Sequence, residues 1–242
     1  MKALTIHNFP ESDYPVAEAL NTLCANLTFT GEHIRCVMLT SCQATEGKSF
    51  LSMNILRTMA RLGKTVALVD ADLRRSAIIT QYGITFNAPH PLGLAHYLAG
   101  MCKPEDILYA TNIPGASIVP AGRLVTNPLS LLSTDSFSAL LAALRRQVDF
   151  VIVDAPPVGI IIDAAEIAGS CDGVLFSVAY NQVTRRELLS AKRQIEKTGA
   201  RILGTVLNNV DFASYTSRKY YNKSYYAHYA SDYYKPLKRR PM

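Results

Sequence analysis

Uninterrupted runs of apolar residues recur along this chain, separated by longer segments in which apolar residues return every three or four positions. The runs are short and rich in Val, Ile and Leu, which favours strands that are buried on both faces. We expect strands over residues 35–41, 64–72, 116–122, 149–157, 173–180 and 201–209.

The segments between most of these runs have helical spacing. We expect helices over residues 14–29, 48–63, about 128–147 and 184–198. Gly63 and Gly199 stand where two of them end, as a glycine after a helix usually does. Residues 83–115 contain several prolines and predict an irregular connection with one short helix near 92–100.

Buried strands that alternate with helices are typical of an α/β fold with a doubly wound, mostly parallel sheet. Such sheets bind ligands in the crevice at the carboxyl ends of their strands. The polar residues that directly follow each apolar run are therefore the candidates for a functional site.

The last part of the chain departs from this pattern. Residues 215–242 hold seven basic residues and one aspartate, which accounts for the whole net charge of +6 and leaves the rest of the chain neutral. We expect one domain over residues 1–212 and a flexible basic tail over residues 213–242. Eight of the chain's 13 tyrosines lie in this tail: Tyr215, Tyr220, Tyr221, Tyr225, Tyr226, Tyr229, Tyr233 and Tyr234.

The five cysteines are scattered and contain no CxxC pair, so we expect a reducing cytoplasm and no thiolate metal site. No basic-then-apolar leader and no apolar stretch of about 18 residues is visible. We therefore expect any membrane association to come from a partner or from the tail.

The first predicted strand runs into the sequence TSCQATEGKSF, and Gly47-Lys48-Ser49 opens the following helix. This pattern is typical of a P-loop, in which backbone N–H groups and the helix N-terminus face phosphates, Lys48 reaches the β and γ oxygens and Ser49 ligates Mg²⁺. Thr45, Glu46 and Phe50 flank these residues in the same candidate nucleotide site. Cys42 stands where the strict motif has its first glycine.

Carboxylates follow two further predicted strands. Asp70 and Asp72 come after one and Asp154 after the other. Beside a P-loop lysine, such a group is suited to hold a hydrated Mg²⁺ and to accept a proton from an attacking hydroxyl. Arg74 is a candidate for stabilising the charge on a transferred phosphoryl group, with a surface ion pair as the alternative.

The P-loop, the stretches ALVDADLRRS, FVIVDAPPV, CDGVLFSV and LGTVLNN, and the tyrosine tail together resemble the bacterial tyrosine kinases of capsule and exopolysaccharide synthesis, of the CpsD and CapB type. The resemblance runs from about residue 15 to the C-terminus. It implies a MinD-like P-loop fold that binds ATP and Mg²⁺ and phosphorylates the tyrosines of its own tail.

Carried over by position, the resemblance makes Lys48 and Ser49 the Walker A pair and Asp154 the Walker B aspartate. Of Asp70 and Asp72, one serves the metal with Ser49 and Asp154, and the other activates tyrosine. Asn208 matches the position that contacts adenine. The resemblance also implies a separate transmembrane co-polymerase as activator, which would hold the chain at the inner face of the plasma membrane.

Two departures from the family concern assembly and the loop. Asn21 and Cys24 replace two arginines of a motif tied to ring-shaped self-assembly, so homo-oligomerisation stays open. Thr45 stands where many members have glycine, which restricts the backbone near the phosphates.

Three functions remain at this point. The first is an autokinase. The second is a catalytically weak ATP-binding scaffold of polysaccharide export. The third is a ParA- or MinD-type ATPase with a nucleic-acid- or membrane-binding tail. Gln43 stands where those ATPases carry a signature lysine, and the body is neutral, so we expect no DNA or RNA partner.

Overall fold

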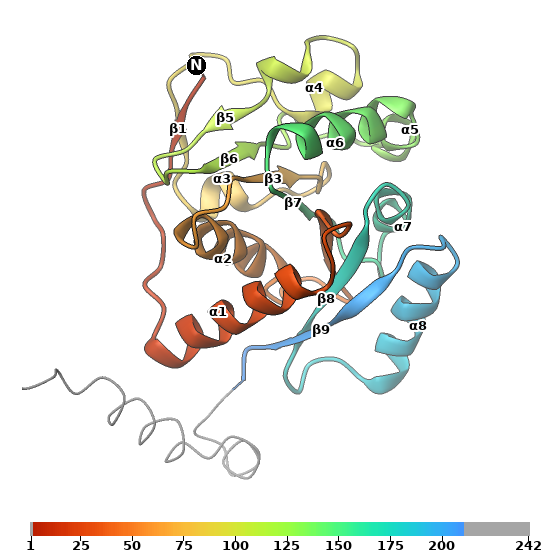
Figure 1. The fold of residues 1–242 in the computed structure, drawn as a ribbon. Coiled ribbons are helices and arrows are strands. Elements are labelled where there is room, and N and C mark those ends of the chain that lie inside the picture. The colour runs from red at the N-terminus through yellow and green to blue at the C-terminus, as the bar shows by residue number, and fades with distance from the viewer. Residues whose placement is uncertain (1, 211–242) are drawn as a thin grey trace, which may run out of the picture. The chain divides into compact units, whose positions relative to one another are not determined.

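The computed structural model describes residues 2–210, and these make up nearly all of the first of two compact units, Met1–Asn208. Within it, a seven-stranded sheet has the order β5-β6-β3-β7-β2-β8-β9 (Figure 1). All pairs are parallel except β5 with β6, and β1 pairs separately with β4. The strands are β1 (Leu4–Thr5), β2 (Cys36–Ser41), β3 (Val66–Asp70), β4 (Thr85–Phe86), β5 (Tyr109–Ala110), β6 (Ala116–Val119), β7 (Phe150–Asp154), β8 (Gly173–Ala179) and β9 (Ile202–Asn208).

Helices cover both faces of the sheet because successive side chains of each strand point to opposite faces. The helices are α1 (Tyr14–Phe29), α2 (Lys48–Arg61), α3 (Ile78–Gln81), α4 (Leu94–Leu98), α5 (Leu129–Leu132), α6 (Asp135–Gln147), α7 (Asp163–Ala168) and α8 (Arg185–Glu196), with one 3₁₀ turn at Pro104–Asp106. Met38 belongs to the core on the side of α4–α8, whereas its neighbours Val37 and Leu39 belong to the core on the side of α1 and α2.

The expected doubly wound, mostly parallel α/β sheet is confirmed, with two local differences. The helical pattern over 128–147 forms α5 and α6, because the chain leaves helical geometry at Thr134, which starts α6 in an extended conformation. Residues 83–115 contain the short strands β4 and β5 besides the expected short helix, α4. Strands of two residues carry too little periodicity to be recognised from sequence.

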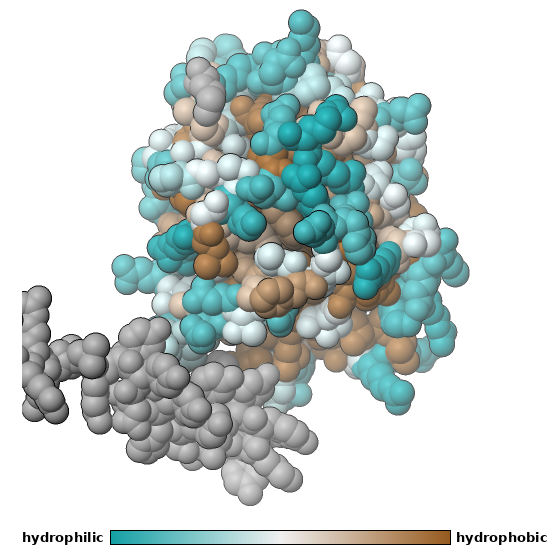
Figure 2. Space-filling view, viewed as in Figure 1, coloured by the Kyte–Doolittle hydropathy of each residue, from teal (hydrophilic) through white to brown (hydrophobic). Residues whose placement is uncertain are grey.

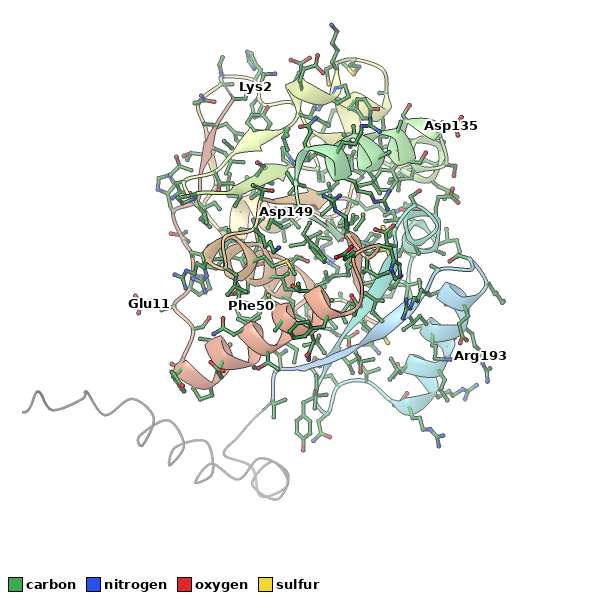
Figure 3. All side chains as sticks on the ribbon, viewed as in Figure 1. Lys2, Glu11, Phe50, Asp135, Asp149 and Arg193 are labelled. Carbon is green, nitrogen blue, oxygen red and sulfur yellow. The ribbon has the colours of Figure 1, made fainter. Side chains whose placement is uncertain are left out.

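Side chains fill the space between the sheet and its helices (Figure 3). On the face shown in Figure 2, apolar surface gathers toward β9 and α8, where Leu207 and Leu189 are exposed. β9 is an edge strand of the sheet and is only partly buried along its length. Its last residue, Asn208, lies at the same end of the sheet as the loop after β2.

Candidate nucleotide and phosphoryl-transfer site

Residues 42–47 form a loop between β2 and α2 at the carboxyl end of the sheet. Gly47 takes a left-handed conformation (φ 79°) and caps α2, so that Lys48 and Ser49 lie in the first turn of the helix. Glycine is favoured here because a side chain would be strained at this positive φ, and because a Cβ would come within 1.9 Å of Asn208 Nδ2 and displace that side chain. The helix N-terminus presents unpaired N–H groups and a partial positive charge, as phosphate binding requires.

Thr45 is exposed and also takes a left-handed conformation, with φ 66°. Its hydroxyl donates to the carbonyl of Ala44 at 2.6 Å. A β-branched residue in this region is strained, because its Cβ approaches the backbone carbonyl. The restricted backbone that the sequence predicts near the phosphates is therefore a strained conformation of Thr45 itself.

Glu46 holds the loop in place through hydrogen bonds of its side chain and its backbone. Its side chain is 1% exposed and accepts hydrogen bonds from Gln43 N and, at 3.1 Å, from Ala179 N. Its backbone carbonyl accepts from Ser177 Oγ at 2.5 Å and from Asn208 Nδ2 at 3.1 Å. The sequence placed Glu46 in the loop but did not identify this supporting role.

Gln43 and Glu187 join the loop to α8. Gln43 Nε2 donates to Glu187 Oε1 at 2.6 Å, while Glu187 Oε2 accepts from the backbone and hydroxyl of Thr184, which caps the helix. These hydrogen bonds, those from Thr184 first, lower the pKa of Glu187. No sequence pattern marks Glu187, which lies 144 residues from its partner Gln43.

The three candidate carboxylates come together at the carboxyl edge of the sheet. Asp70 and Asp154 are register partners on β3 and β7 and are 0% and 1% exposed, and Asp72 is 5% exposed. Asp154 accepts from Ser49 Oγ at 2.7 Å and from Ser52 Oγ at 2.9 Å. Asp72 Oδ2 lies 3.6 Å from Lys48 Nζ.

Asp70 has an unusual environment. Burial and then the neighbouring Asp154 raise its pKa to about 8, against a smaller opposing effect of the hydrogen bond from Ser76. Its Oδ1 is buried and has no hydrogen-bond partner among the described residues. Burial also raises the pKa of Asp154, although Lys48 and the serine hydroxyls oppose the shift.

Arg74 makes a forked contact with Asp163, a buried residue at the start of α7. Its Nε and Nη2 lie 2.6 Å and 3.0 Å from the two carboxylate oxygens, and its Nη1 donates to Thr126 O at 3.1 Å. The hydrogen bond to Asp163 raises the pKa of Arg74. The guanidinium of Arg74 therefore links α7 to the loop that contains Thr126. A direct role of Arg74 in phosphoryl transfer stays a prediction.

The residues present fit a magnesium ion held together with phosphate. Within residues 2–210, no cluster of three or more His, Cys, Asp or Glu side chains is arranged to hold a metal by itself. Mg²⁺ usually binds through one or two carboxylates, water and substrate phosphates, so such a cluster is not required. The Ser49 hydroxyl donates its hydrogen bond to Asp154, so the lone pairs of its Oγ remain available to a cation.

Phe50 and Cys24 pack inward. Phe50 is partly buried against the core around α1 and α2 (Figure 3). Cys24 is 0% exposed, and burial raises its pKa to about 12. Asn21 is exposed and donates to Glu18 at 3.4 Å. Cys24, which stands at the position of the second arginine in the motif tied to self-assembly, is therefore a core residue in this chain.

The eight tail tyrosines lie outside the described residues. Within residues 2–210, no helix has both the length and the apolar composition needed to cross a membrane.

Comparisons with known proteins agree on one group. The chain is 34% identical over 206 residues to tyrosine-protein kinase CpsD of Streptococcus agalactiae, a match covering 85% of this chain and 88% of that protein. It is 34% identical over 196 residues to CpsD of Streptococcus pneumoniae serotype 4, covering 81% and 85%. No protein-family model matches the chain.

Solved structures give the same result. The kinase domain of Escherichia coli tyrosine kinase ETK superposes with a TM-score of 0.77 at 25% identity, covering 87% of this chain and 90% of that one. The chimerical protein CapA2B2 superposes with a TM-score of 0.75 at 26% identity, covering 85% and 92%. MinD of Pyrococcus horikoshii, solved with Mg-ADP, shares the fold at a TM-score of 0.60 and 22% identity, covering 72% and 69%.

Proposed function

Because this chain belongs to the bacterial tyrosine-protein kinases of the CpsD and CapB type, we propose that it transfers the γ-phosphoryl group of ATP to the tyrosines of its own tail, and that it regulates capsular or exopolysaccharide synthesis through this reaction. One observation carries the proposal: five side chains meet at the carboxyl edge of the sheet, namely Lys48, Ser49, Asp70, Asp72 and Asp154. The same sequence holds eight tyrosines after residue 213.

Lys48 and the first turn of α2 bind the phosphates. The Lys48 ammonium and the N–H groups that follow Gly47 neutralise the β and γ oxygens, and this charge stabilisation is most of what phosphoryl transfer demands. Asn208 lies against the loop with its Nδ2 on Glu46 O, so its Oδ1 remains an acceptor for the amino group of adenine. Guanine presents an acceptor there, which favours ATP.

Asp70 accepts the proton of the attacking tyrosine. A tyrosine hydroxyl has a pKa of about 10 and needs a nearby base at neutral pH. In the nucleotide-free protein the pKa of Asp70 is raised to about 8, which keeps the carboxyl protonated at neutral pH. The positive charge of a bound Mg²⁺ would lower this pKa and leave a carboxylate that accepts the proton. Its Oδ1 has no hydrogen-bond partner among the described residues and is the oxygen left free for that proton.

Ser49, Asp72 and Asp154 would hold Mg²⁺ beside the phosphates. A bound ion would supply further positive charge to neutralise the phosphates. Asp72 Oδ2 lies 3.6 Å from Lys48 Nζ, so the metal-holding carboxylate and the phosphate-binding ammonium meet at this position. Arg74 fixes the segment that carries Asp72 through its contacts with Asp163 and Thr126.

The proposed phosphoacceptors are the eight tyrosines between residues 215 and 234, in a tail that begins near residue 213. Residues 213–242 span up to about 100 Å when extended, so the length permits transfer within one chain or between two copies. The body carries no net charge, which favours a protein acceptor over nucleic acid.

A membrane-anchored activator on a separate chain is the proposed partner, and it would place this protein at the inner face of the plasma membrane. The likeness to a protein solved as a CapA2B2 chimera supports a kinase chain that works with a second chain. Homo-oligomerisation is also proposed, but through contacts other than the family's arginines, because Asn21 and Cys24 stand in their place.

Turnover by the purified full chain tests the proposal. We would incubate it with ATP and Mg²⁺, with and without the cytoplasmic segment of a candidate membrane protein, and measure phosphotyrosine and ADP. Lys48→Ala is expected to abolish both signals, whereas Lys64→Ala, in the exposed turn before β3, leaves them unchanged. ATP binding without tyrosine phosphate under either condition would contradict the kinase and support the scaffold.

A further inference from the structure

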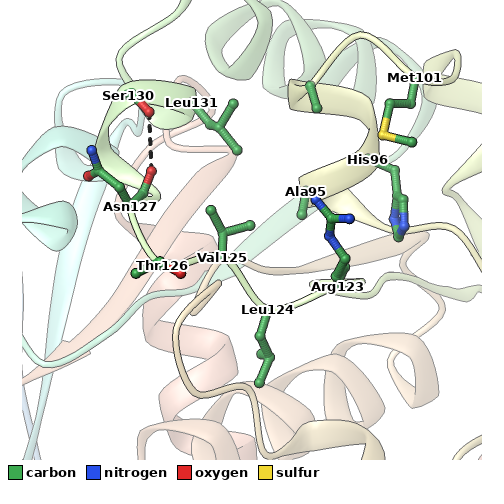
Figure 4. Close-up of a pocket in the computed structure, with 11 residues that line it drawn as sticks. Ala95, His96, Met101, Arg123, Leu124, Val125, Thr126, Asn127, Ser130 and Leu131 are labelled. Carbon is green, nitrogen blue, oxygen red and sulfur yellow. Dashed lines mark hydrogen bonds between the residues drawn. The ribbon is translucent and has the colours of Figure 1, made fainter.

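A pocket of about 590 Å³ lies beside the proposed active site, between α4 and the segment that leads into α5 (Figure 4). Its volume falls within the range of about 300–1,000 Å³ that is usual for small-ligand sites. None of the residues assigned to nucleotide or phosphoryl transfer lines it.

Apolar side chains and two nitrogen-bearing side chains line this pocket together. Met101 and Leu124 are 64% and 59% exposed, and Val125 is partly buried against the core. Arg123 is exposed, extends toward Ala95 and His96 in Figure 4, and has no ion-pair or hydrogen-bond partner for its side chain within residues 2–210. Such a lining suits a ligand with an apolar body and an anionic end.

His96 adds a hydrogen-bond donor. Its Nδ1 accepts from Gly93 N at 3.1 Å, which places the ring proton of a neutral histidine on Nε2. No partner for Nε2 is found within the described part of the chain. Arg123 and His96 therefore offer a guanidinium fork and an N–H group to one anion.

Backbone hydrogen bonds hold the pocket wall and connect it to the segment that follows β3. Leu94 N and Ala95 N donate to the carbonyls of Pro120 and Ala121 at 2.8 Å and 3.0 Å. On the other side of the same segment, Val125 N donates to Leu73 O at 2.9 Å, and Arg74 Nη1 donates to Thr126 O. The wall thus continues into the segment that carries Asp72.

From this geometry we propose that the pocket binds phosphotyrosine from the tail, residues 213–242, with the phosphate on Arg123 and His96 and the ring against Met101, Leu124 and Val125. The inference rests on the proposed function, since that reaction makes phosphotyrosine on this tail. The site would hold the reaction product next to the place where it is formed.

Charge explains why the pocket would distinguish the product from the substrate. The unmodified tail carries seven basic residues against one aspartate, and Arg123 repels it. Each phosphotyrosine adds about −1.5 to −2 charges, so a few phosphates cancel or reverse the charge of the tail. A bidentate arginine contact with phosphate is then available, as in other phosphotyrosine sites.

Fluorescence anisotropy with synthetic peptides tests the proposal. The panel is eight labelled peptides of residues 213–242, each with phosphotyrosine at one of the cluster positions, and the unphosphorylated parent. The protein is the dephosphorylated full chain, saturated with ADP and Mg²⁺ so that the P-loop is filled and no transfer occurs. At least one phosphopeptide is expected to bind about tenfold or more tightly than the parent peptide.

Variants assign the binding to the pocket. Arg123→Gln is expected to weaken the best phosphopeptide about 10- to 100-fold, and Arg123→Lys less, because lysine keeps the charge but loses the fork. Arg193→Gln is the matched control: Arg193 is exposed on α8 (Figure 3), and its loss should change affinity less than twofold. Arg123 has no partner to lose within residues 2–210, and an unchanged thermal midpoint would verify folding.

The inference is overturned if every phosphopeptide binds like the parent, or if Arg123→Gln binds as tightly as the wild type. It is also overturned if binding appears only when ADP is withheld, since the P-loop would then hold the phosphate. Because the peptides are synthetic, these results do not depend on whether the chain is a kinase, and failure of the proposed function shows separately in the turnover assay.

Discussion

At the residue scale, the site contains two energetically unfavourable features, a pair of buried carboxyl groups and a strained backbone. Asp70 and Asp154 are register partners buried beside each other, and burial raises the pKa of both. Thr45 holds a left-handed backbone next to the phosphate site. A strained backbone and buried neighbouring carboxyl groups cost stability, and such features tend to occur where a ligand or reaction uses them.

Asp70→Asn should change the pH dependence of stability in the nucleotide-free protein. Native Asp70 keeps its proton up to about pH 8, against an ordinary value of 3.8, so the native state binds more protons than the unfolded state between these values. Wild-type stability therefore falls as pH rises through this window. Relative to wild type, Asp70→Asn should gain more than about 1 kcal/mol between pH 5 and pH 8, measured by urea denaturation in EDTA.

Asp149→Asn is the control for this experiment, since backbone and side-chain hydrogen bonds from Thr65 lower the pKa of Asp149. Its effect should not grow between pH 5 and pH 8, because Asp149 is ionised in both states throughout that range. A constant difference between Asp70→Asn and the wild type would contradict the raised pKa.

Thr45→Asn should stabilise the protein by about 1 kcal/mol, because asparagine tolerates the left-handed conformation better than a β-branched residue. Thr45→Val keeps the strain and removes the hydroxyl that donates to Ala44 O. Thermal denaturation of both variants checks this. The strain argument fails if the valine variant is as stable as the asparagine variant.

At the element scale, the P-loop is held by strands and a helix far away in sequence. Glu46 ties it to β8 and to Asn208 at the end of β9, and Gln43 ties it to Glu187 in α8. The position of the loop thus depends on β8, β9 and α8, which come later in the sequence. Substitutions in β8 or β9 should therefore change the affinity for nucleotide.

Glu46→Gln should destabilise the protein by about 1–3 kcal/mol and weaken ATP binding. The amide replaces one carboxylate oxygen with a donor that meets the N–H of Gln43 or Ala179, and so leaves a buried group unpaired. Urea denaturation and calorimetric titration with ATP measure the two effects. Glu32→Gln, at an exposed position, is the control, and equal behaviour of the two variants would refute the bracing role.

Arg74 and Asp163 should act as one unit. Because the guanidinium is engaged by Asp163 and Thr126 O, Arg74→Ala and Asp163→Ala should each lower kcat about tenfold, and the double variant little further. If Arg74 acted directly on the transferred phosphoryl group, Arg74→Ala would lower kcat and Asp163→Ala would not. Steady-state kinetics of the two single variants and the double variant distinguish these cases.

At the scale of the whole molecule, local sequence patterns predicted most of the fold. Strands buried on both faces appear as uninterrupted apolar runs, and Gly47-Lys48-Ser49 marks its own place at a helix start. Contacts between distant segments left no such signal: Ser177 meets Glu46 across 131 residues and Arg74 meets Asp163 across 89. The supporting partners of the site could therefore be found only from the structure.

The most direct test of the account is mapping of phosphotyrosine by mass spectrometry on the full chain after incubation with ATP and Mg²⁺, with the activating segment present. We expect phosphate on tyrosines between residues 215 and 234, absent in Lys48→Ala and strongly reduced in Asp70→Asn. Phosphate on these tyrosines that persists in Lys48→Ala, or a wild-type tail without phosphate while ATP is bound, would contradict it.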